Sequence, residues 1–275
     1  MKNKKDSLGD RMKAYENVSK PFLTLGVPKI VRLDMRAGHT FCRNFIRPFD
    51  DVFSQCMIYT TKALCEKVPG AVFAYTQSDE ISIVMNDITE KGEIACFFDG
   101  NVEKIVSVTA SIATKAFNRR YMELVFKLPV LDPMKKIYEK NLWEAEFDSR
   151  TFCLPSVMEV HNYILWRQND ATRNSIQMVG HANFSQKEMH GKNCGQIQDM
   201  LMLEKEINWN DFPARYKRGA LIAKERYEKT SAVPGKDPVK MVTAVRTRWI
   251  EREIPILTKD KAIVERLFFR EQSEG

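Results

Sequence analysis

The chain has 275 residues, a hydrophobic fraction of 44%, a charged fraction of 29% and a net charge of +7. These values are ordinary for a soluble globular protein with one large domain or a catalytic core with additions. No run of residues in the sequence is long and apolar enough to span a bilayer. The charged start MKNKKDSLGD lacks the apolar stretch of a secretory signal. We therefore expect a cytoplasmic protein with no membrane partner.

The reactive side chains show no metal-binding or disulfide spacing. The six cysteines include no CxxC pair, and the four histidines are not spaced with them as zinc ligands. We expect reduced thiols that serve mostly in packing. The excess of basic residues favours a polyanionic partner, nucleic acid first, because cations cluster late in the chain, at 215–219, 224–229 and 245–253. Each cluster alone is also typical of a solvated surface with long side chains.

The first strong strand pattern is PKIVRLD, residues 28–34, which ends on Asp34. A polar opening segment, residues 1–20, precedes it and is expected to end in a helix. The loop that follows, residues 35–50, is rich in arginine but lacks the GxxxxGK[ST] pattern of a P-loop. Its backbone N–H groups and arginines are still suited to a triphosphate.

A helix is predicted from Asp50 or Asp51 to about Val68, followed by a hairpin over residues 71–86. The hairpin pattern consists of two apolar, β-branched or aromatic runs, AVFAY and ISIVM, which are joined by the polar link TQSDE. Its tip carries Asp79 and Glu80. A second helix is expected to begin after Asn101, which is suited to capping it, and residues 147–155 read as a further strand.

The element order is therefore strand, helix, two strands, helix, strand. This βαββαβ order predicts an α+β, ferredoxin-like palm of the kind found in polymerases and nucleotide cyclases. In that fold the end of the first strand lies beside the tip of the central hairpin, so we expect Asp34 and Asp79 to meet and bind divalent metal. From the residues alone, two alternatives to a metal site stay open: Asp79 lies in a solvated turn, and Asp34 caps a turn.

Beyond the palm the pattern indicates helices and two late strands. Ser156 with Glu159, and Ser185 with Glu188, have the spacing of capping boxes that begin helices. The segments 215–222 and 247–255 are expected to pair as strands. We therefore divide the chain into a palm catalytic core, residues 1–155, and a helical and basic part, residues 156–275, which packs on the palm and contacts RNA or nucleotide.

Several stretches together resemble the tRNA-histidine guanylyltransferases and their bacterial and archaeal relatives, the 3′–5′ RNA polymerases. They are spread over residues 8–222 and read LGDRMKAYE, VRLDMRAGHTF, TQSDEIS, FDSR with LPS, WRQND and RYKRG. The combination of RLDxR with TQSDEIS is specific. LGDRMKAYE and INWNDFP look more like the tRNA-repair branch than the eukaryotic histidine enzymes.

The resemblance implies a two-magnesium site. Asp34 and Asp79 would be the two carboxylate ligands, the backbone carbonyl of Met35 would be the third protein ligand, and Glu80 would belong to the same catalytic acidic cluster. Magnesium prefers such hard oxygen ligands and completes its shell with water and phosphate oxygens.

The resemblance also implies substrate contacts. GTP or ATP would be bound by the loop after the first strand, the serine before the aspartate and a later basic residue, that is, by Arg36, Ala37, Gly38, His39, Thr40, Arg47 and Ser78. The RNA end or a second nucleotide would lie near Arg167, Asp170 and Asn174. The family further implies tRNA as partner and a homotetramer.

Three departures from the family pattern matter. Met35 replaces a glycine, which is tolerable where the turn needs no positive φ. Gly38 replaces an aromatic residue, so a packing surface is lost there. The family's HINNLYN motif is replaced at residues 171–177 by ATRNSIQ and lacks its histidine. We therefore expect templated repair of 5′-truncated tRNA rather than strict action on histidine tRNA.

Two other interpretations stay open at this point. One is a palm enzyme that acts on nucleotides without RNA, such as a nucleotide cyclase or a diguanylate-type synthase. The other is a catalytically inactive RNA-binding relative, which would keep its RNA affinity when Asp79 is replaced.

Overall fold

The computed structural model describes residues 7–89, 91–232 and 241–269. Within these residues six strands form one antiparallel sheet with the order β4-β1-β3-β2-β5-β6. The strands are β1 Lys29–Met35, β2 Ala71–Gln77, β3 Glu80–Met85, β4 Phe147–Cys153, β5 Ala220–Ala232 and β6 Met241–Glu253.

The first four strands and two helices form the predicted palm. Helix α3, Asp51–Lys67, connects β1 to β2, and helix α4, Val102–Lys127, connects β3 to β4. Both predicted caps are present: the side chain of Asp50 accepts from the N–H of Phe53, and that of Asn101 accepts from the N–H of Lys104, each at 2.9 Å. The ferredoxin-like βαββαβ arrangement is confirmed.

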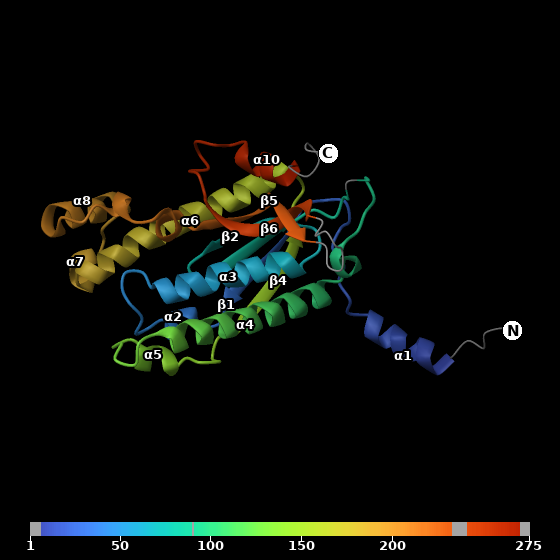
Figure 1. Ribbon diagram of the computed structural model, residues 1–275, viewed down its shortest axis with the longest axis horizontal. Coiled ribbons are helices and arrows are strands. Elements are labelled where there is room, and N and C mark those ends of the chain that lie inside the picture. The colour runs from blue at the N-terminus through green and yellow to red at the C-terminus, as the bar shows by residue number, and fades with distance from the viewer. Residues whose placement is uncertain (1–6, 90, 233–240, 270–275) are drawn as a thin grey trace.

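Alternate residues of the strands are buried on opposite faces of the sheet. On one face, Val31, Leu33 and their neighbours pack against α3 and α4, which lie side by side (Figure 1). On the other, Ile30, Phe73 and Val84 pack against α6, Val157–Asn183, and α10, Ile263–Phe269. Successive side chains of a strand point to opposite faces, and both faces of β1, β2 and β3 are covered, so these three strands are buried almost throughout.

A third apolar cluster lies beyond the sheet, along the C-terminal half of α6. It joins that helix to α7, Gln186–Met189, α8, Cys194–Lys205, and the 3-10 turn η2, Trp209–Asp211. The predicted capping box at Ser185 and Glu188 is present in full. At Ser156 the hydroxyl accepts from the N–H of Glu159 at 3.3 Å and caps α6.

The prediction of a strand over 215–222 is wrong in its first half. Residues Ala214–Arg218 form a helical turn, α9, and strand β5 begins only at Ala220. Gly219 between them has φ of +81°, and a Cβ there would lie 2.6 Å from the hydroxyl of Tyr75. Glycine at this position therefore permits both the positive φ that ends α9 and the close approach of the backbone to Tyr75 before β5 begins.

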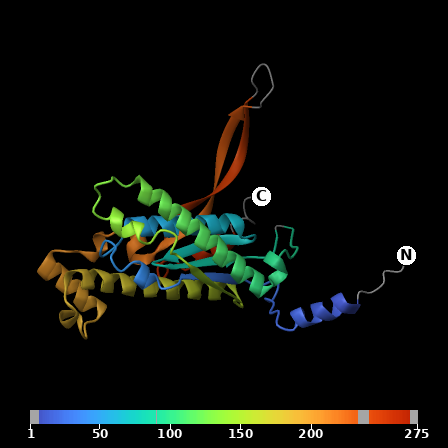
Figure 2. The ribbon, with the colours of Figure 1, turned by 90° about the horizontal axis from the view of Figure 1, so that it is seen from below.

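Two elements project from the body. The outer parts of β5 and β6 extend away from the sheet as a long hairpin, which we call the arm, residues 224–232 and 241–249 (Figure 2). Helix α1, Ser7–Asn17, also projects and has no buried residue. The remaining short elements are α2 Gly38–Phe41, η1 Phe97–Gly100 and α5 Lys135–Glu139.

The sheet includes strands from both sides of residue 155, since β5 pairs with β2. The division into residues 1–155 and 156–275 stays a prediction. In the described part of the chain no helix combines the length and the apolar character needed to cross a bilayer.

Candidate active site

Asp34 and Asp79 lie together at one end of the palm sheet. Asp34, near the end of β1, is opposite Glu80 of β3 in the strand register. The N–H of Met35 donates to the carbonyl of Asp79 at 3.1 Å, so the hairpin tip is bound to the end of β1. Ser78 at the tip has φ of +48°, which makes the link between β2 and β3 as short as two residues.

The two carboxyls share an electrostatic environment that disfavours negative charge. Partial burial, followed by the charges of Asp79 and Glu80, raises the pKa of Asp34 to about 6. Burial also raises the pKa of Asp79, and hydrogen bonds from its own backbone and from Ser78 oppose this only in part. Within the described residues neither carboxylate has an ion-pair partner. The site therefore concentrates acid groups without a protein cation to neutralise them.

Glu80, by contrast, is neutralised by protein groups. Its carboxylate pairs with the guanidiniums of Arg32 on β1 and Arg167 on α6, the latter at 2.8 Å, and also accepts from the side-chain amide of Gln77 at 3.1 Å. Through its ion pair with Arg167, Glu80 joins the β2–β3 hairpin to helix α6. Its predicted catalytic role is not tested by this placement, but its contacts are those of a residue that fixes the hairpin.

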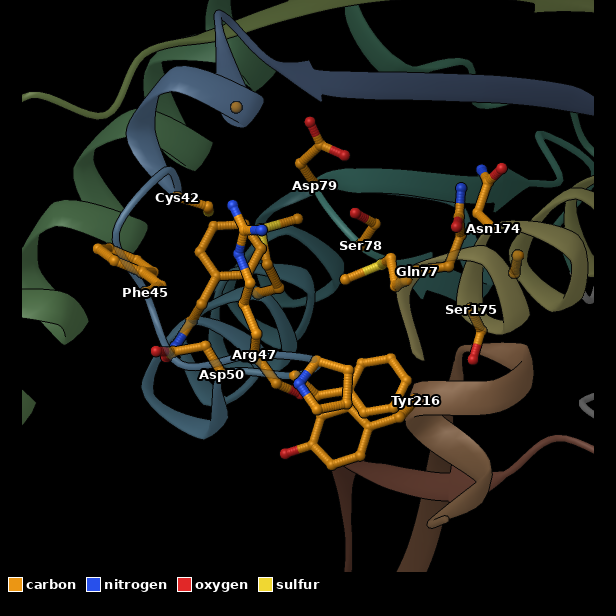
Figure 3. Close-up of a pocket in the computed structure, with 18 of the residues that line it drawn as sticks. Cys42, Phe45, Arg47, Asp50, Gln77, Ser78, Asp79, Asn174, Ser175 and Tyr216 are labelled. Carbon is orange, nitrogen blue, oxygen red and sulfur yellow. The ribbon is translucent and has the colours of Figure 1, made fainter. Parts of the chain in front are cut away.

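A pocket of about 720 Å³ adjoins the hairpin tip (Figure 3). Its walls are the loop from Gly38 to Asp50, the tip itself, the C-terminal half of α6 and residues around α9. Four of the residues predicted to bind nucleotide line it, namely Gly38, His39, Arg47 and Ser78, together with Asp79. Arg47 extends into this space from the loop.

The other predicted nucleotide contacts lie outside this pocket. The guanidinium of Arg36 pairs with Glu146 at 2.7 Å, and both side chains are largely exposed. Ala37 has φ of +53° and precedes α2, whose first turn includes an N–H···O bond from Thr40 to the carbonyl of Ala37. Met35 is in extended strand with no positive φ, so the replacement of glycine costs nothing there.

The three residues predicted on α6 have different positions. Asn174 lines the pocket and donates to Asp170 at 3.3 Å. Asp170 accepts hydrogen bonds from Arg167 and Arg173. Burial by itself raises the pKa of the Asp170 carboxyl, but the hydrogen bonds and charges of these two arginines outweigh it, so the pKa is lowered. Arg167 is buried and directed to the hairpin. The structure therefore brings Asn174 to the pocket and uses the other two to hold it in place.

Two groups in the pocket wall were not predicted as site residues. Asp50, expected only as a helix cap, also accepts from the N–H of Ile46 and from the hydroxyl of Tyr138 at 2.6 Å, and thereby holds the arginine-rich loop. Phe49 and Tyr216 stack face to face, with ring centroids 4.8 Å apart. These contacts join segments distant in the chain, and the only local signal was the RYKRG run.

The residues present fit a divalent cation bound together with substrate. Asp34 and Asp79 supply hard oxygen atoms without a competing cation, and a bound ion would relieve the cost of burying their charges. Among the described residues no three side chains of His, Cys, Asp and Glu gather as a closed metal site. The remaining ligands would be a backbone carbonyl, water and phosphate, as is usual for magnesium.

The model of the tRNAHis guanylyltransferase family matches residues 9–155, more than half of the chain. The solved structure of a bacterial tRNA(His) guanylyltransferase-like protein in complex with ATP is 38% identical, with a TM-score of 0.76 over 95% of this chain and 99% of that one. The solved structure of a bacterial tRNA(His) guanylyltransferase-like protein in complex with GTP is 37% identical, with a TM-score of 0.74 over 96% of this chain and 100% of that one. The tRNA(His) guanylyltransferase of Saccharomyces cerevisiae is 26% identical over 209 residues, 71% of this chain and 82% of its own. The sequence motifs, the palm and these matches agree: the chain belongs to the tRNAHis guanylyltransferase family.

Proposed function

We propose that this chain is a nucleotidyltransferase that adds nucleotides to the 5′ end of tRNA, in the 3′–5′ direction, as templated repair of 5′-truncated tRNA. The observation that carries the proposal is that Asp34, at the end of β1, and Asp79, at the hairpin tip bound to β1 by the Met35 N–H, lie at the same end of the palm sheet, next to a nucleotide-sized pocket. Membership of the family supports the enzyme class and the RNA substrate.

Two magnesium ions would be held by the carboxylates of Asp34 and Asp79 and the backbone carbonyl of Met35. When bound, such a pair lowers the pKa of an attacking hydroxyl and neutralises charge on the phosphates. The chain's own residues hold the hairpin tip next to the end of β1, because the Met35 N–H donates to the Asp79 carbonyl and Arg32 and Arg167 pair with Glu80.

Nucleoside triphosphates are the small-molecule substrates that the pocket favours. The bacterial relatives were solved with ATP and with GTP. In this chain Arg47, His39 and Ser78 line the same pocket as Asp79, so a bound triphosphate can contact the Arg47 guanidinium and the Ser78 hydroxyl next to the Asp79 carboxylate. On a 5′-triphosphorylated RNA, the 3′-hydroxyl oxygen of the incoming nucleotide bonds to the α-phosphorus, pyrophosphate leaves, and the hydroxyl proton passes to solvent.

The arm gives the RNA a second contact outside the pocket. It places cations next to aromatic rings, with Arg248 over Tyr227 at 4.9 Å and Lys224 over Trp249 at 5.4 Å. Such pairs are suited to phosphates and to bases together. We include in the proposal a cytoplasmic location and a homotetramer, which the family resemblance favours.

The alternative of a cyclase or diguanylate-type enzyme is not favoured, because the match extends over almost the full length of bacterial proteins named for tRNA. An inactive RNA-binding relative is not favoured either, because both carboxylates are present at the same end of the sheet, close enough for the charge of Asp79 to raise the pKa of Asp34.

The test uses 5′-truncated tRNA, carrying either a 5′-triphosphate or a 5′-monophosphate, with magnesium and each nucleotide in turn. Wild-type protein is expected to extend the 5′-triphosphorylated RNA, from which pyrophosphate can leave, and Asp34→Asn and Asp79→Asn to lose at least about 100-fold of the rate while circular dichroism shows the folded state. The 5′-monophosphorylated RNA has no such leaving group and tests whether prior activation by ATP is needed.

Asp148 offers a matched control. It is opposite Asp34 on β4, is exposed, and pairs with Arg150 at 3.3 Å. Asp148→Asn is expected to keep the rate within about twofold, since exposed ion pairs contribute little. Extension that survives both Asp34→Asn and Asp79→Asn would contradict the proposed site.

A further inference from the structure

We propose that Trp166 on α6 is a stacking platform for an unpaired base of the RNA, in the 3′ strand opposite the 5′ end that is extended. The inference rests on the proposed function, because 5′ truncation of a paired stem leaves nucleotides of the 3′ strand unpaired. Trp166 is 54% exposed, although it lies in the middle of a helix that packs on the sheet. Its indole is therefore open to a ligand at the surface of the protein.

Two neighbours hold the indole of Trp166 in place. The guanidinium of Arg167 lies over the ring, 4.4 Å from its centroid, and the ring of Tyr163 meets it at a steep angle with centroids 5.9 Å apart. Tyr163 is anchored to the sheet in turn, because its hydroxyl lies 3.1 Å from that of Ser82 on β3. The indole thus has a fixed orientation before a base arrives, which lowers the entropic cost of stacking.

Arg167 connects this ring to the acidic end of the palm sheet. Its guanidinium is buried and pairs with Glu80 at 2.8 Å and with Asp170 at 2.9 Å. Glu80 directly follows Asp79 in the chain and is opposite Asp34 in the strand register. One arginine side chain therefore lies between the indole and Glu80, the neighbour of the residues proposed to hold metal.

The surroundings of Trp166 favour nucleic acid as the ligand. Arg173 is 64% exposed and lies seven residues further along α6, which places it two turns away on the same face of the helix. Arg150 of β4 is 54% exposed and shares its face of the strand with Phe152, whose ring meets Tyr163 with centroids 5.6 Å apart. Both arginines pair with an aspartate at the surface, a contact that phosphate can replace at little cost. An aromatic face among such cations is typical of sites for single-stranded nucleic acid.

The RNA fits this platform better than the incoming nucleotide does. Among the described residues, the pocket includes α6 only from Ala171 onward, so Trp166 lies outside it. The 5′-terminal base of the RNA is not available to the indole either, since the nucleotide that is added stacks on that base. Bases of the unpaired 3′ strand have free faces, and aromatic side chains bind such bases in RNA. An unpaired base of the 3′ strand is therefore the occupant that suits both the place and the reaction.

The test measures equilibrium binding of two acceptor-stem RNAs, one with a short unpaired 3′ overhang and one blunt, to wild type, Trp166→Leu and Trp166→Phe. Both variants keep an apolar side chain over Arg167, but only phenylalanine has an aromatic face, so the comparison separates stacking from packing. Wild-type protein is expected to bind the overhang RNA about tenfold more tightly than the blunt RNA. Trp166→Leu should lose this preference, and Trp166→Phe should keep most of it.

Two further measurements assign the effect to Trp166 itself. Wild-type protein irradiated with an overhang RNA that contains 5-iodouridine, placed at each unpaired position in turn, should form a cross-link at Trp166, identified by mass spectrometry of its peptides. Phe126→Ala is the matched control and should keep the preference in full, because this aromatic side chain is 61% exposed but belongs to α4, on the other face of the sheet. The KM for the nucleoside triphosphate should stay unchanged in every variant, since Trp166 is outside the pocket.

The outcomes separate this inference from the proposed function. Equal wild-type affinity for the two RNAs, a preference that survives in Trp166→Leu, or an equal loss in both variants overturns the platform and leaves the proposed function standing. A cross-link at Trp166 and a preference that depends on its aromatic face, without extension of any RNA, overturn the proposed function and leave the platform as an RNA-binding site. Wild-type protein that binds neither RNA overturns both. If Trp166→Leu does not fold, the wild-type cross-link decides, and its absence at Trp166 overturns the platform.

Discussion

Three acids lie at the open end of the palm, and their neighbours give them different roles. Asp34 and Asp79 lie at the same end of the sheet and have no ion pair among the described residues, whereas Glu80 is paired with Arg32 and Arg167. The Nε atoms of both arginines are buried and have no partner in the described part of the chain. These guanidiniums already lack one hydrogen bond each, so they depend strongly on the Glu80 carboxylate.

Replacing Glu80 by glutamine is therefore expected to destabilise the fold before it affects chemistry. Removal of one partner leaves two guanidiniums with reduced neutralisation, and we expect a loss of about 2–3 kcal/mol in the free energy of unfolding. Urea unfolding of Glu80→Gln against wild type measures this. A fully stable Glu80→Gln protein without activity would instead indicate that Glu80 acts directly on the substrate.

Asp34 makes stability depend on pH in a defined direction. Its folded pKa, about 6, lies above the value of 3.8 for an unperturbed group. Between these values the folded state binds more protons than the unfolded state, so stability falls as pH rises through this range and is constant above it. Because Asp34 is partly exposed, we expect only about 1 kcal/mol.

The measurement compares wild type with Asp34→Asn by urea unfolding in EDTA, at one pH below this range and one above it. The asparagine side chain cannot ionise, so the variant is expected to gain stability relative to wild type at the higher pH and not at the lower. An equal difference at both pH values would show that the Asp34 charge is not penalised in the folded state.

At the scale of elements, the palm was predictable because its signals are local. Short apolar, β-branched or aromatic runs identified β1 and the hairpin, and Asp50 and Asn101 identified where α3 and α4 begin. The fold then placed Asp34 beside Asp79 from topology alone. The prediction of a strand over 215–222 was wrong at RYKR, which forms a helical turn. The contact of Gly219 with Tyr75, which marks the end of this turn, lies between segments that are distant in the chain.

The unpredicted parts of the site depend on contacts between distant segments. The bond from Tyr138 to Asp50 joins residues 88 apart, and the pair of Arg167 with Glu80 joins helix to hairpin. No spacing in the sequence indicates either contact. The family resemblance implies that Arg167 lies near RNA or nucleotide, whereas the structure pairs its guanidinium with Glu80 and Asp170 within the protein.

The arm yields a prediction at the same scale. Lys229 and Arg246 are exposed on its two strands. Replacing both with glutamate is expected to weaken binding of tRNA, and the slope of log affinity against log salt should fall by about 1 for each phosphate that is no longer neutralised. Filter binding over a salt series measures both quantities.

Nucleotide incorporation at the pocket, measured with a short RNA, provides the control for the arm variant. Incorporation of a nucleotide onto a short 5′-truncated acceptor-stem RNA should keep its rate in the same variant if this short duplex does not reach the arm. Unchanged tRNA affinity and salt slope would show that the arm does not contact the RNA backbone.

At the scale of the whole molecule, α1 projects from the body and has no buried residue among those that the structure describes. Leu8, Met12 and Tyr15 are exposed along it, and isolated helices of 11 residues are marginal in water. The proposed homotetramer would change this environment. Light scattering after gel filtration is expected to give the mass of four chains, and the mass of one chain would contradict the proposal.

The continuous pairing of β5 with β6 has a geometric consequence. The ladder runs without a shift from Ala220, in the pocket wall, to Ala232, over a span of about 40 Å at the usual strand rise. A twisted two-stranded ribbon resists stretching along its length, so its outer part stands at a set distance from the nucleotides being joined. If the arm contacts RNA as proposed, its outer part would reach the RNA up to this distance from the pocket.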